Sequence, residues 1–141
     1  MLISDRGIAK LADFGCSKQL DGMRTASLEE SLHRITGSIP WMAPEVIRQT
    51  GAGRRSDVWS VGATIIEMAT GKHPWPDFHN NLAALFHIAT SGKTPPVPPS
   101  LPPAAQDFLA RCFCLDPAER DSASELLAHP WILQTGPGRK E

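Results

Sequence analysis

The feature that most constrains the fold is a helical stretch at residues 57–70 whose side chains are apolar almost all the way round. The residues that interrupt it lie at helical spacing and form one thin polar stripe: Ser60, Thr64 and Glu67. A helix with so little polar surface is typical of the middle of a protein. Ser56 is its predicted N-cap and Gly71 its predicted C-terminal stop. We therefore expect a mainly helical domain built around this stretch.

Two amphipathic helices are expected after it. Apolar residues share one face in each of them, Leu82, Leu85, Phe86 and Ala89 in the first and Ala105, Phe108, Leu109 and Cys112 in the second. Residues 94–103 between them are rich in proline, which lacks a backbone N–H group, and are expected to be extended. Residues 122–125 read Ser-Ala-Ser-Glu, a capping box that opens a last short helix. Residues 134–141 form a polar tail.

The N-terminal part of the chain predicts a small β-hairpin. An apolar run at residues 1–3 is followed by Ser-Asp-Arg-Gly at residues 4–7, which supplies turn chemistry, and residues 8–12 resume an extended pattern. Residues 16–38 then show no helical or strand period and are rich in hydroxyl groups. An irregular segment of this length within a compact domain is usually functional.

Composition and charge narrow the possible function. The chain is 41% hydrophobic and 21% charged, which is ordinary for a globular domain. Its formal net charge of −1 argues against binding to nucleic acid or to an anionic membrane surface. The three cysteines, Cys16, Cys112 and Cys114, make no even disulfide framework and suit the cytosol or the nucleus. Cys112 and Cys114 point to different faces of a helix, so buried thiols are favoured over a metal site.

Short motifs at both ends of the irregular segment carry the functional signal. Asp13-Phe14-Gly15 follows the predicted hairpin, and Ala43-Pro44-Glu45 closes the segment before the apolar helix. Further motifs follow in a fixed order: Trp41-Met42, Asp57-Val58-Trp59-Ser60-Val61-Gly62, Thr70-Gly71, Pro74-Trp75, Arg120 and His129-Pro130-Trp131. In these motifs the chain resembles the catalytic domain of eukaryotic protein kinases. The resemblance implies a partial C-terminal lobe at residues 1–133, in which a small β-hairpin precedes an activation segment and helices.

The resemblance also implies where ATP and Mg²⁺ are held. Asp13 matches the carboxylate that binds magnesium in the family, where the metal neutralises charge on the bound phosphates. Leu2 matches the position that forms an apolar floor beneath the adenine, and Ala12 lies beside it. For Leu2 and Ala12 a place in the ordinary core is an equally good interpretation.

Several residues have structural roles in the family. Glu45 matches the partner of Arg120 in an ion pair that holds the activation segment on the helices. Loss of one partner costs about 3–5 kcal/mol if the pair is buried, and at most about 1 kcal/mol if it is exposed. Asp57 matches a residue that caps the backbone of the catalytic loop, and it also suits the first turn of a helix. Trp59 and Gly62 belong to the same motif.

Residues 36–41 bear on the substrate class. Serine/threonine kinases carry Gly-Ser or Gly-Thr where this chain has Gly37-Ser38, and tyrosine kinases tend to carry proline at the place of Ser38. Residues 63–75 and 82–90 resemble most the mitogen-activated protein kinase kinase kinases, notably the plant-type group. That group implies protein substrates such as a downstream kinase, and upstream regulators. The candidate phosphosites are loop hydroxyls: Thr25, Ser27, Ser31 and Thr36.

Parts of the kinase machinery are missing from this sequence. It holds no glycine-rich phosphate loop, no strand lysine with its helix glutamate and no His-Arg-Asp motif, so no catalytic base is present and Ser38 has a supporting role only. We expect a kinase fragment that is inactive in isolation and exposes an apolar patch on the helix at residues 57–70. The alternative is a short non-catalytic docking or dominant-negative module that binds kinases through residues 72–78 and the helix from Leu82.

Overall fold

The structure is a computed structural model that describes residues 2–14 and 39–135. The chain divides into two compact units, Met1–Ile35 and Thr36–Glu141. A two-stranded sheet is the regular structure described in the first unit, and the second consists of helices and their connections. This confirms the expected mainly α architecture with a small N-terminal hairpin. Within the described ranges, no helix combines the length and apolar character needed to cross a membrane.

The hairpin of the first unit forms as predicted. Strand β1 (Leu2–Ile3) pairs with strand β2 (Ala9–Lys10) in antiparallel register, so that the first residue of β1 lies opposite the last residue of β2. Gly7 adopts a φ of 73°, a left-handed conformation that glycine tolerates at no steric cost, and its N–H group donates to the Ser4 carbonyl at 3.0 Å. The turn chemistry read from the sequence therefore closes this hairpin.

The long helix of the second unit begins earlier than predicted. Helix α3 (Arg54–Thr70) has Gly53 as its N-cap, so the prediction of Ser56 at that position was wrong. Ser56 lies in the first turn instead, where its hydroxyl accepts a hydrogen bond from the Gly53 N–H group at 3.3 Å. Gly71 ends the helix as predicted, with a φ of 67° and an N–H group that donates to the Glu67 carbonyl at 2.7 Å.

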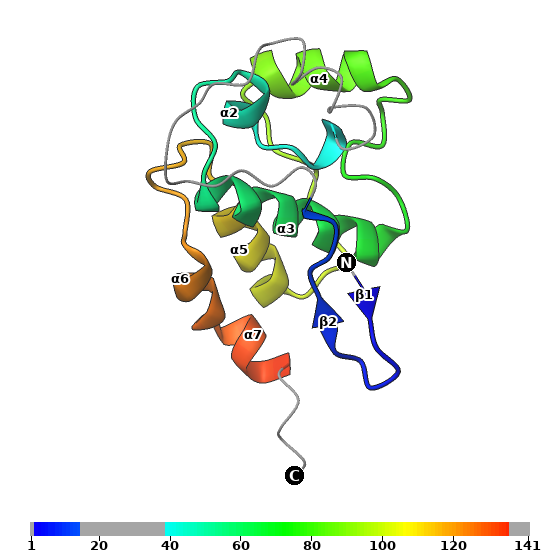
Figure 1. The fold of residues 1–141 in the computed structure, drawn as a ribbon, viewed down its shortest axis with the longest axis vertical. Helices are drawn as coiled ribbons and strands as arrows, with labels where there is room; N and C mark the ends of the chain where they lie inside the picture. Colours follow the sequence, from blue (N-terminus) through cyan, green and yellow to red (C-terminus); the bar gives the residue numbers. More distant parts are fainter. Residues whose placement is uncertain (1, 15–38, 136–141) are drawn as a thin grey trace. The chain divides into compact units, whose positions relative to one another are not determined.

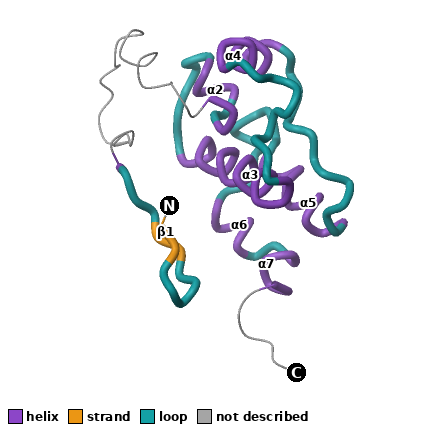
Figure 2. The backbone as a smooth tube through the Cα atoms, turned by 90° about the vertical axis from the view of Figure 1, so that its right-hand side faces the viewer, coloured by secondary structure: helices purple, strands orange, loops and turns teal. Residues whose placement is uncertain are grey.

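Helix α3 crosses the middle of the second unit (Figure 1). The 3₁₀ helix η2 (Ile39–Trp41) contacts it on one side and also contacts α4 (Asn81–Thr90), which packs on α2 (Pro44–Ile47). Helix α5 (Pro103–Cys112) packs on the other side of α3. The turned view shows the same order, with α2 and α4 above α3 and α6 and α7 below it (Figure 2).

The surface of α3 is only partly covered. The thin polar stripe packs against η2, where the Ser60 hydroxyl donates to the Trp41 carbonyl at 2.9 Å and the Trp41 indole N–H donates to the Glu67 carboxylate at 3.1 Å. Val61 is 50% exposed and Met68 is 71% exposed. Both residues are large and apolar, and no described element covers them. The helix therefore has exposed apolar side chains, and an extended apolar patch on it stays a prediction.

The buried face of α4 differs from the predicted one. Ala84 and Ile88 are buried, whereas Leu82 and Phe86 are about three-fifths exposed at 61% and 60%. His87 explains the difference, because its ring packs against the rings of Trp75 and Phe78 at 5.3 and 4.5 Å between centroids. Because of these contacts, the face of α4 that carries positions 84, 87 and 88 packs against the rest of the unit. The face that contains Leu82 and Phe86 is left at the surface.

The remaining helices agree more closely with the sequence. Helix α5 buries the predicted face, and its first residue is Pro103, which is therefore helical and not extended. The capping box opens α6 (Ala123–Leu127), with the Glu125 N–H group donating to the Ser122 hydroxyl at 3.2 Å. A further helix, α7 (Pro130–Thr135), follows, so the polar tail expected from residue 134 is helical at its start.

Candidate functional site

A buried ion pair joins two segments of the second unit that are far apart in the sequence. Glu45 belongs to the short helix α2, and Arg120 lies in the loop between α5 and α6. Two hydrogen bonds connect the side chains in parallel, from Arg120 Nη1 to Glu45 Oε1 at 2.7 Å and from Nη2 to Oε2 at 3.1 Å. The Arg120 side chain is 0% exposed and that of Glu45 is 8% exposed. The pair is thus bidentate and buried, the geometry in which arginine binds a carboxylate most strongly.

Further hydrogen bonds satisfy the other polar atoms of this pair. Arg120 Nε donates to the Cys114 carbonyl at 2.9 Å, and Nη1 also donates to the Arg55 carbonyl at 2.8 Å. The Ser56 hydroxyl donates to Glu45 Oε1 at 2.9 Å. We call Glu45, Arg120, Ser56 and the Arg55 and Cys114 carbonyls the anchor cluster. It fixes α2 to the N-terminal turns of α3 and to the loop after α5.

The local sequence around Glu45 and around Arg120 explains why the two side chains face each other. Pro44 is the first residue of α2, where its missing N–H group and fixed φ are tolerated, so the helix begins directly after the extended Ala43 and Glu45 lies in its first turn. Asp116 builds the turn before Arg120: its carboxylate accepts from the Ala118 N–H group at 2.9 Å and its carbonyl accepts from the Arg120 N–H group at 3.0 Å. The Asp-Pro turn at residues 116–117 therefore positions the arginine.

The anchor cluster lowers the pKa of Glu45 below its usual value of 4.5. Burial alone would raise this pKa, but the hydrogen bonds from Arg120, the local backbone and Ser56, together with the arginine's charge, outweigh burial. A carboxyl with a depressed pKa stabilises the fold at pH values above its unfolded pKa. That contribution is lost as the pH falls through the folded pKa.

We therefore expect the difference in unfolding free energy between wild type and Glu45→Gln to depend on pH. It should be constant from pH 7 down to about pH 5 and should shrink below the usual carboxyl value of 4.5. Urea titrations of both chains at a series of pH values measure it directly. The other carboxyl groups titrate in both proteins, so their contributions cancel in the difference in unfolding free energy. A difference that stays constant down to about pH 3 would show that Glu45 has no depressed pKa.

Trp59 packs directly on the anchor cluster from α3. Its side chain is 0% exposed, and the Arg120 guanidinium carbon lies 5.1 Å from the ring centroid. The Phe113 ring meets it edge-on, with 5.0 Å between centroids and 74° between planes. Within the described residues the Trp59 indole N–H group has no hydrogen-bond partner. The ring therefore acts through its faces and edges, by packing and by cation–π attraction.

Gly62 allows α3 and α5 to approach each other closely. A Cβ atom at this position would lie 2.8 Å from the Cys112 Cβ atom and 2.9 Å from Phe113 Cζ. Both neighbours are buried, with exposures of 0% and 2%. Real Cβ contacts are not this short, so a side chain here would force α5 away from α3.

Gly62→Ala is accordingly expected to destabilise the chain by about 1–3 kcal/mol, the usual cost of overpacking. Alanine in a helix interior normally stabilises by about 0.5–1 kcal/mol relative to glycine, so steric overlap reverses the sign. Urea unfolding followed by circular dichroism gives the value. Gly53→Ala is the comparison without steric overlap, since its Cβ atom would meet nothing within 4 Å, and as a change at the N-cap it should cost at most about 1 kcal/mol. Equal or greater stability of Gly62→Ala would contradict the close approach.

Asp57 has no partner within the described residues. It is exposed in the first turn of α3, and its side chain forms no hydrogen bond or ion pair with another described residue. A carboxylate in this turn interacts favourably with the helix dipole, as the sequence allowed. The role of capping a catalytic loop stays a prediction, because no such loop lies among the residues described.

The first unit contains the residues expected to hold ATP and Mg²⁺. Asp13 is exposed with a φ of 66°, a left-handed conformation that few residues other than glycine, asparagine and aspartate adopt. Leu2 is exposed in β1 and Ala12 is half-buried. Asp13 can offer a carboxylate to a hard cation, but the described ranges contain no group of three or more possible metal ligands. These residues therefore provide one ligand and no complete metal site.

The remaining predicted site residues lie outside the described ranges. They are Ser38 and the candidate phosphosites Thr25, Ser27, Ser31 and Thr36. Cys16 lies there as well, while Cys112 is buried and Cys114 half-buried. Burial raises the pKa of the Cys112 thiol to about 12, so this cysteine is an unreactive core residue.

Sequence reasoning missed a hydrogen-bonded role for the two His-Pro-Trp motifs. In each, the histidine Nδ1 atom accepts a hydrogen bond from the backbone N–H group of the tryptophan, at 3.2 Å for both His73 with Trp75 and His129 with Trp131. His129 also meets Asp107 Oδ2 through Nε2 at 2.9 Å. The signal available in the sequence was that His-Pro-Trp occurs twice. In the structure, each copy forms a local turn that the histidine side chain closes.

Comparison with known proteins assigns the family. The protein kinase domain family matches residues 1–132. Mitogen-activated protein kinase kinase kinase 2 of Arabidopsis thaliana is 47% identical over 94% of this chain and 20% of its own length. Mitogen-activated protein kinase kinase kinase A of Dictyostelium discoideum is 46% identical over 94% of this chain and 14% of its own length.

A yeast relative gives a similar match. Serine/threonine-protein kinase STE11 of Saccharomyces cerevisiae is 42% identical over 94% of this chain and 18% of its own length. The chain thus spans one fifth or less of the length of these curated relatives. The family match covers both units and includes Asp13 and the two charges of the anchor cluster. The chain belongs to the protein kinase domain family.

Proposed function

We propose that these 141 residues are part of an ATP-dependent serine/threonine kinase of the mitogen-activated protein kinase kinase kinase type, which phosphorylates a downstream kinase. The observation that carries the proposal is the anchor cluster, because its buried pair joins α2, just after the irregular segment, to the helices as the kinase resemblance implies. Relatives at 46–47% identity with that printed name support the subgroup. The proposal places the protein in the cytosol or the nucleus.

In this proposal the first unit contributes to nucleotide binding. The Asp13 carboxylate is exposed and supplies one oxygen ligand to Mg²⁺. Bound Mg²⁺ neutralises negative charge on the phosphates of ATP. Leu2 and Ala12 contribute apolar surface for the adenine. The left-handed backbone at Asp13 sets the direction of its side chain, and strained conformations of this kind are frequent at functional sites.

Phosphoryl transfer depends mainly on positioning and electrostatics, and the 141 residues contain no His-Arg-Asp motif to orient the acceptor hydroxyl. We therefore expect no phosphate transfer by this chain alone. A chimera tests the proposal: the N-terminal part of the kinase domain of the Arabidopsis relative is fused ahead of these residues. The chimera should phosphorylate serine or threonine on a downstream kinase, as measured with labelled ATP and phosphoamino-acid analysis.

Asp13→Asn in the chimera should reduce transfer by about 10³-fold or more, because the metal loses a charged ligand. Asp5→Asn is the matched control, since Asp5 is an exposed carboxylate in the turn of the same hairpin. A folded chimera that transfers no phosphate, or one that tolerates Asp13→Asn, would refute the proposal. Transfer to tyrosine would refute the substrate class.

A second candidate function is a non-catalytic docking module, and the exposed Leu82 and Phe86 on α4 favour it. They are large apolar residues one helical turn apart, the spacing with which a helix presents anchors to a partner. In that case the isolated chain, added in excess, should inhibit phosphorylation of a downstream kinase by the Arabidopsis relative. Leu82→Ser with Phe86→Ser should abolish the inhibition, and Leu127→Ser, at another exposed leucine, should not.

A further inference from the structure

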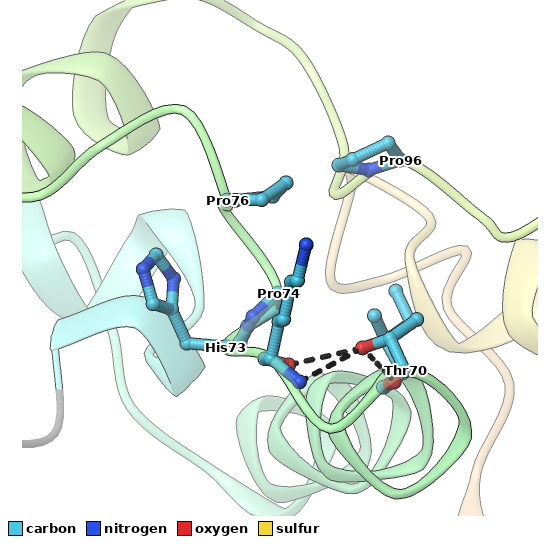
Figure 3. Close-up of a pocket in the computed structure, with 7 residues that line it drawn as sticks. Thr70, His73, Pro74, Pro76 and Pro96 are labelled. Atoms are coloured by element: carbon cyan, nitrogen blue, oxygen red, sulfur yellow. Dashed lines mark hydrogen bonds between the residues drawn. The ribbon is translucent and has the colours of Figure 1, made fainter.

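A cavity of about 250 Å³ lies at the C-terminal end of α3, and part of its lining belongs to residues 72–78, the segment that the docking alternative uses. Ile66 and Thr70 line it from the helix, and three prolines complete its walls. Figure 3 shows Pro76 and Pro96 extending from two separate loops toward the same space, with Thr70 and Pro74 beneath. The walls thus come from three parts of the chain.

Hydrogen bonds fix the base of the cavity. The Thr70 hydroxyl donates to the Ile66 carbonyl at 2.8 Å and accepts from the Lys72 N–H group at 3.2 Å, which fixes the turn after the helix. Pro74 is fully buried at the base, whereas Pro76 and Pro96 are exposed and form the rim. The rings fix φ of all three prolines, so this part of the backbone has less freedom to lose when a ligand binds.

Charge at the cavity has a single sign. Lys72 is exposed, and among the described residues its ammonium group has no ion-pair or hydrogen-bond partner. None of the residues that line the cavity is aspartate or glutamate. A cation beside apolar walls attracts a ligand that joins an anionic group to an apolar one.

We propose that this cavity binds an aromatic side chain flanked by carboxylates, presented by a linear acidic segment of a partner protein. The volume lies below the roughly 300–1,000 Å³ of small-molecule sites, whereas a cavity of about 150 Å³ already holds a benzene ring. Proline rings present C–H groups that pack well on the electron-rich face of an aromatic ring. Lys72 then pairs with the neighbouring carboxylate. The proposal stands independently of kinase activity.

Fluorescence polarisation with the full chain tests this site. The probe is a labelled peptide with one tryptophan between glutamates. Two control peptides carry alanine in place of the tryptophan or lysines in place of the glutamates. Saturable binding is expected for the first peptide only. Lys72→Glu should weaken binding about tenfold, because one attraction becomes a repulsion. Lys93→Glu, at another exposed lysine, should change it less than about twofold. Pro76→Ala, which removes part of one wall, should weaken binding measurably.

Several results would overturn the proposal. One is that Lys72→Glu and Lys93→Glu weaken peptide binding equally, which would indicate non-specific electrostatic attraction. Another is equal binding of the peptide that carries alanine, since the cavity would then be unused. Displacement of the peptide by decanoate at lower concentration would assign the site to free amphiphiles. Concentration-dependent association of the chain in the ultracentrifuge, lost in Lys72→Glu, would assign it to a second copy.

Discussion

Arg120→Met is expected to lower the unfolding free energy of the chain by about 3–5 kcal/mol. The substitution leaves the Glu45 carboxylate buried with the Ser56 hydroxyl as its remaining side-chain donor, and it removes the arginine N–H groups that donate to the Cys114 and Arg55 carbonyls. An unpaired buried charge costs far more than the net contribution of the pair itself. Urea unfolding followed by circular dichroism measures the loss of unfolding free energy.

A double-mutant cycle separates the penalty of the lone charge from the contribution of the pair. Glu45→Met alone strands the Arg120 guanidinium and should cost a similar amount. The double variant should be more stable than the sum of the two single effects predicts, by about 1–3 kcal/mol, since neither charge remains buried alone. Recovery will be incomplete, because the hydrogen bonds from Arg120 to the Arg55 and Cys114 carbonyls stay lost.

Arg111→Met is the matched control for this cycle. Arg111 also forms ion pairs, with Asp107 at 3.1 Å and Asp121 at 3.4 Å, but half of its side chain is exposed. Exposed pairs contribute at most about 1 kcal/mol, so this substitution should have a small effect. If Arg120→Met and Arg111→Met lower stability equally, the anchor cluster does not hold the second unit together in solution.

Local sequence signals predicted the elements but not always their faces. The helical period identified α5 and its buried residues, since a single apolar face is available there. In α4 two faces satisfy the same spacing, one with Leu82 and Phe86 and one with Ala84 and Ile88. The contacts of His87 with Trp75 and Phe78 decide between them, and such contacts between separate segments cannot be read from periodicity.

Long-range pairing was predictable only through resemblance. Glu45 and Arg120 are 75 positions apart, and no local pattern connects them. Local chemistry nevertheless explains how each charge is presented, through the proline at the start of α2 and the turn at Asp116. The start of α3 was misplaced because Ser56 is a good N-cap residue by type, whereas the helix begins after Gly53 and uses the same hydroxyl from inside its first turn.

Trp59→Ala is expected to cost about 3–5 kcal/mol of unfolding free energy, the usual range for removing a buried aromatic ring. The substitution opens a cavity between α3, Phe113 and the guanidinium of Arg120, and it removes both the edge-on ring contact at 5.0 Å and the cation–π contact at 5.1 Å. Because the ring lies over the anchor cluster, its loss also exposes the buried ion pair to water, which weakens the attraction between the two charges.

Trp59→Phe tests which part of this side chain matters. The indole N–H group has no partner among the described residues, so its removal leaves no new unsatisfied atom, and a single ring still lies over Arg120. We expect a loss of about 1–2 kcal/mol from the smaller volume, well below the effect of alanine. Urea unfolding and near-ultraviolet circular dichroism measure both variants. If phenylalanine and alanine prove equally damaging, the indole nitrogen must have a partner in solution, and stabilisation by ring packing alone would be refuted.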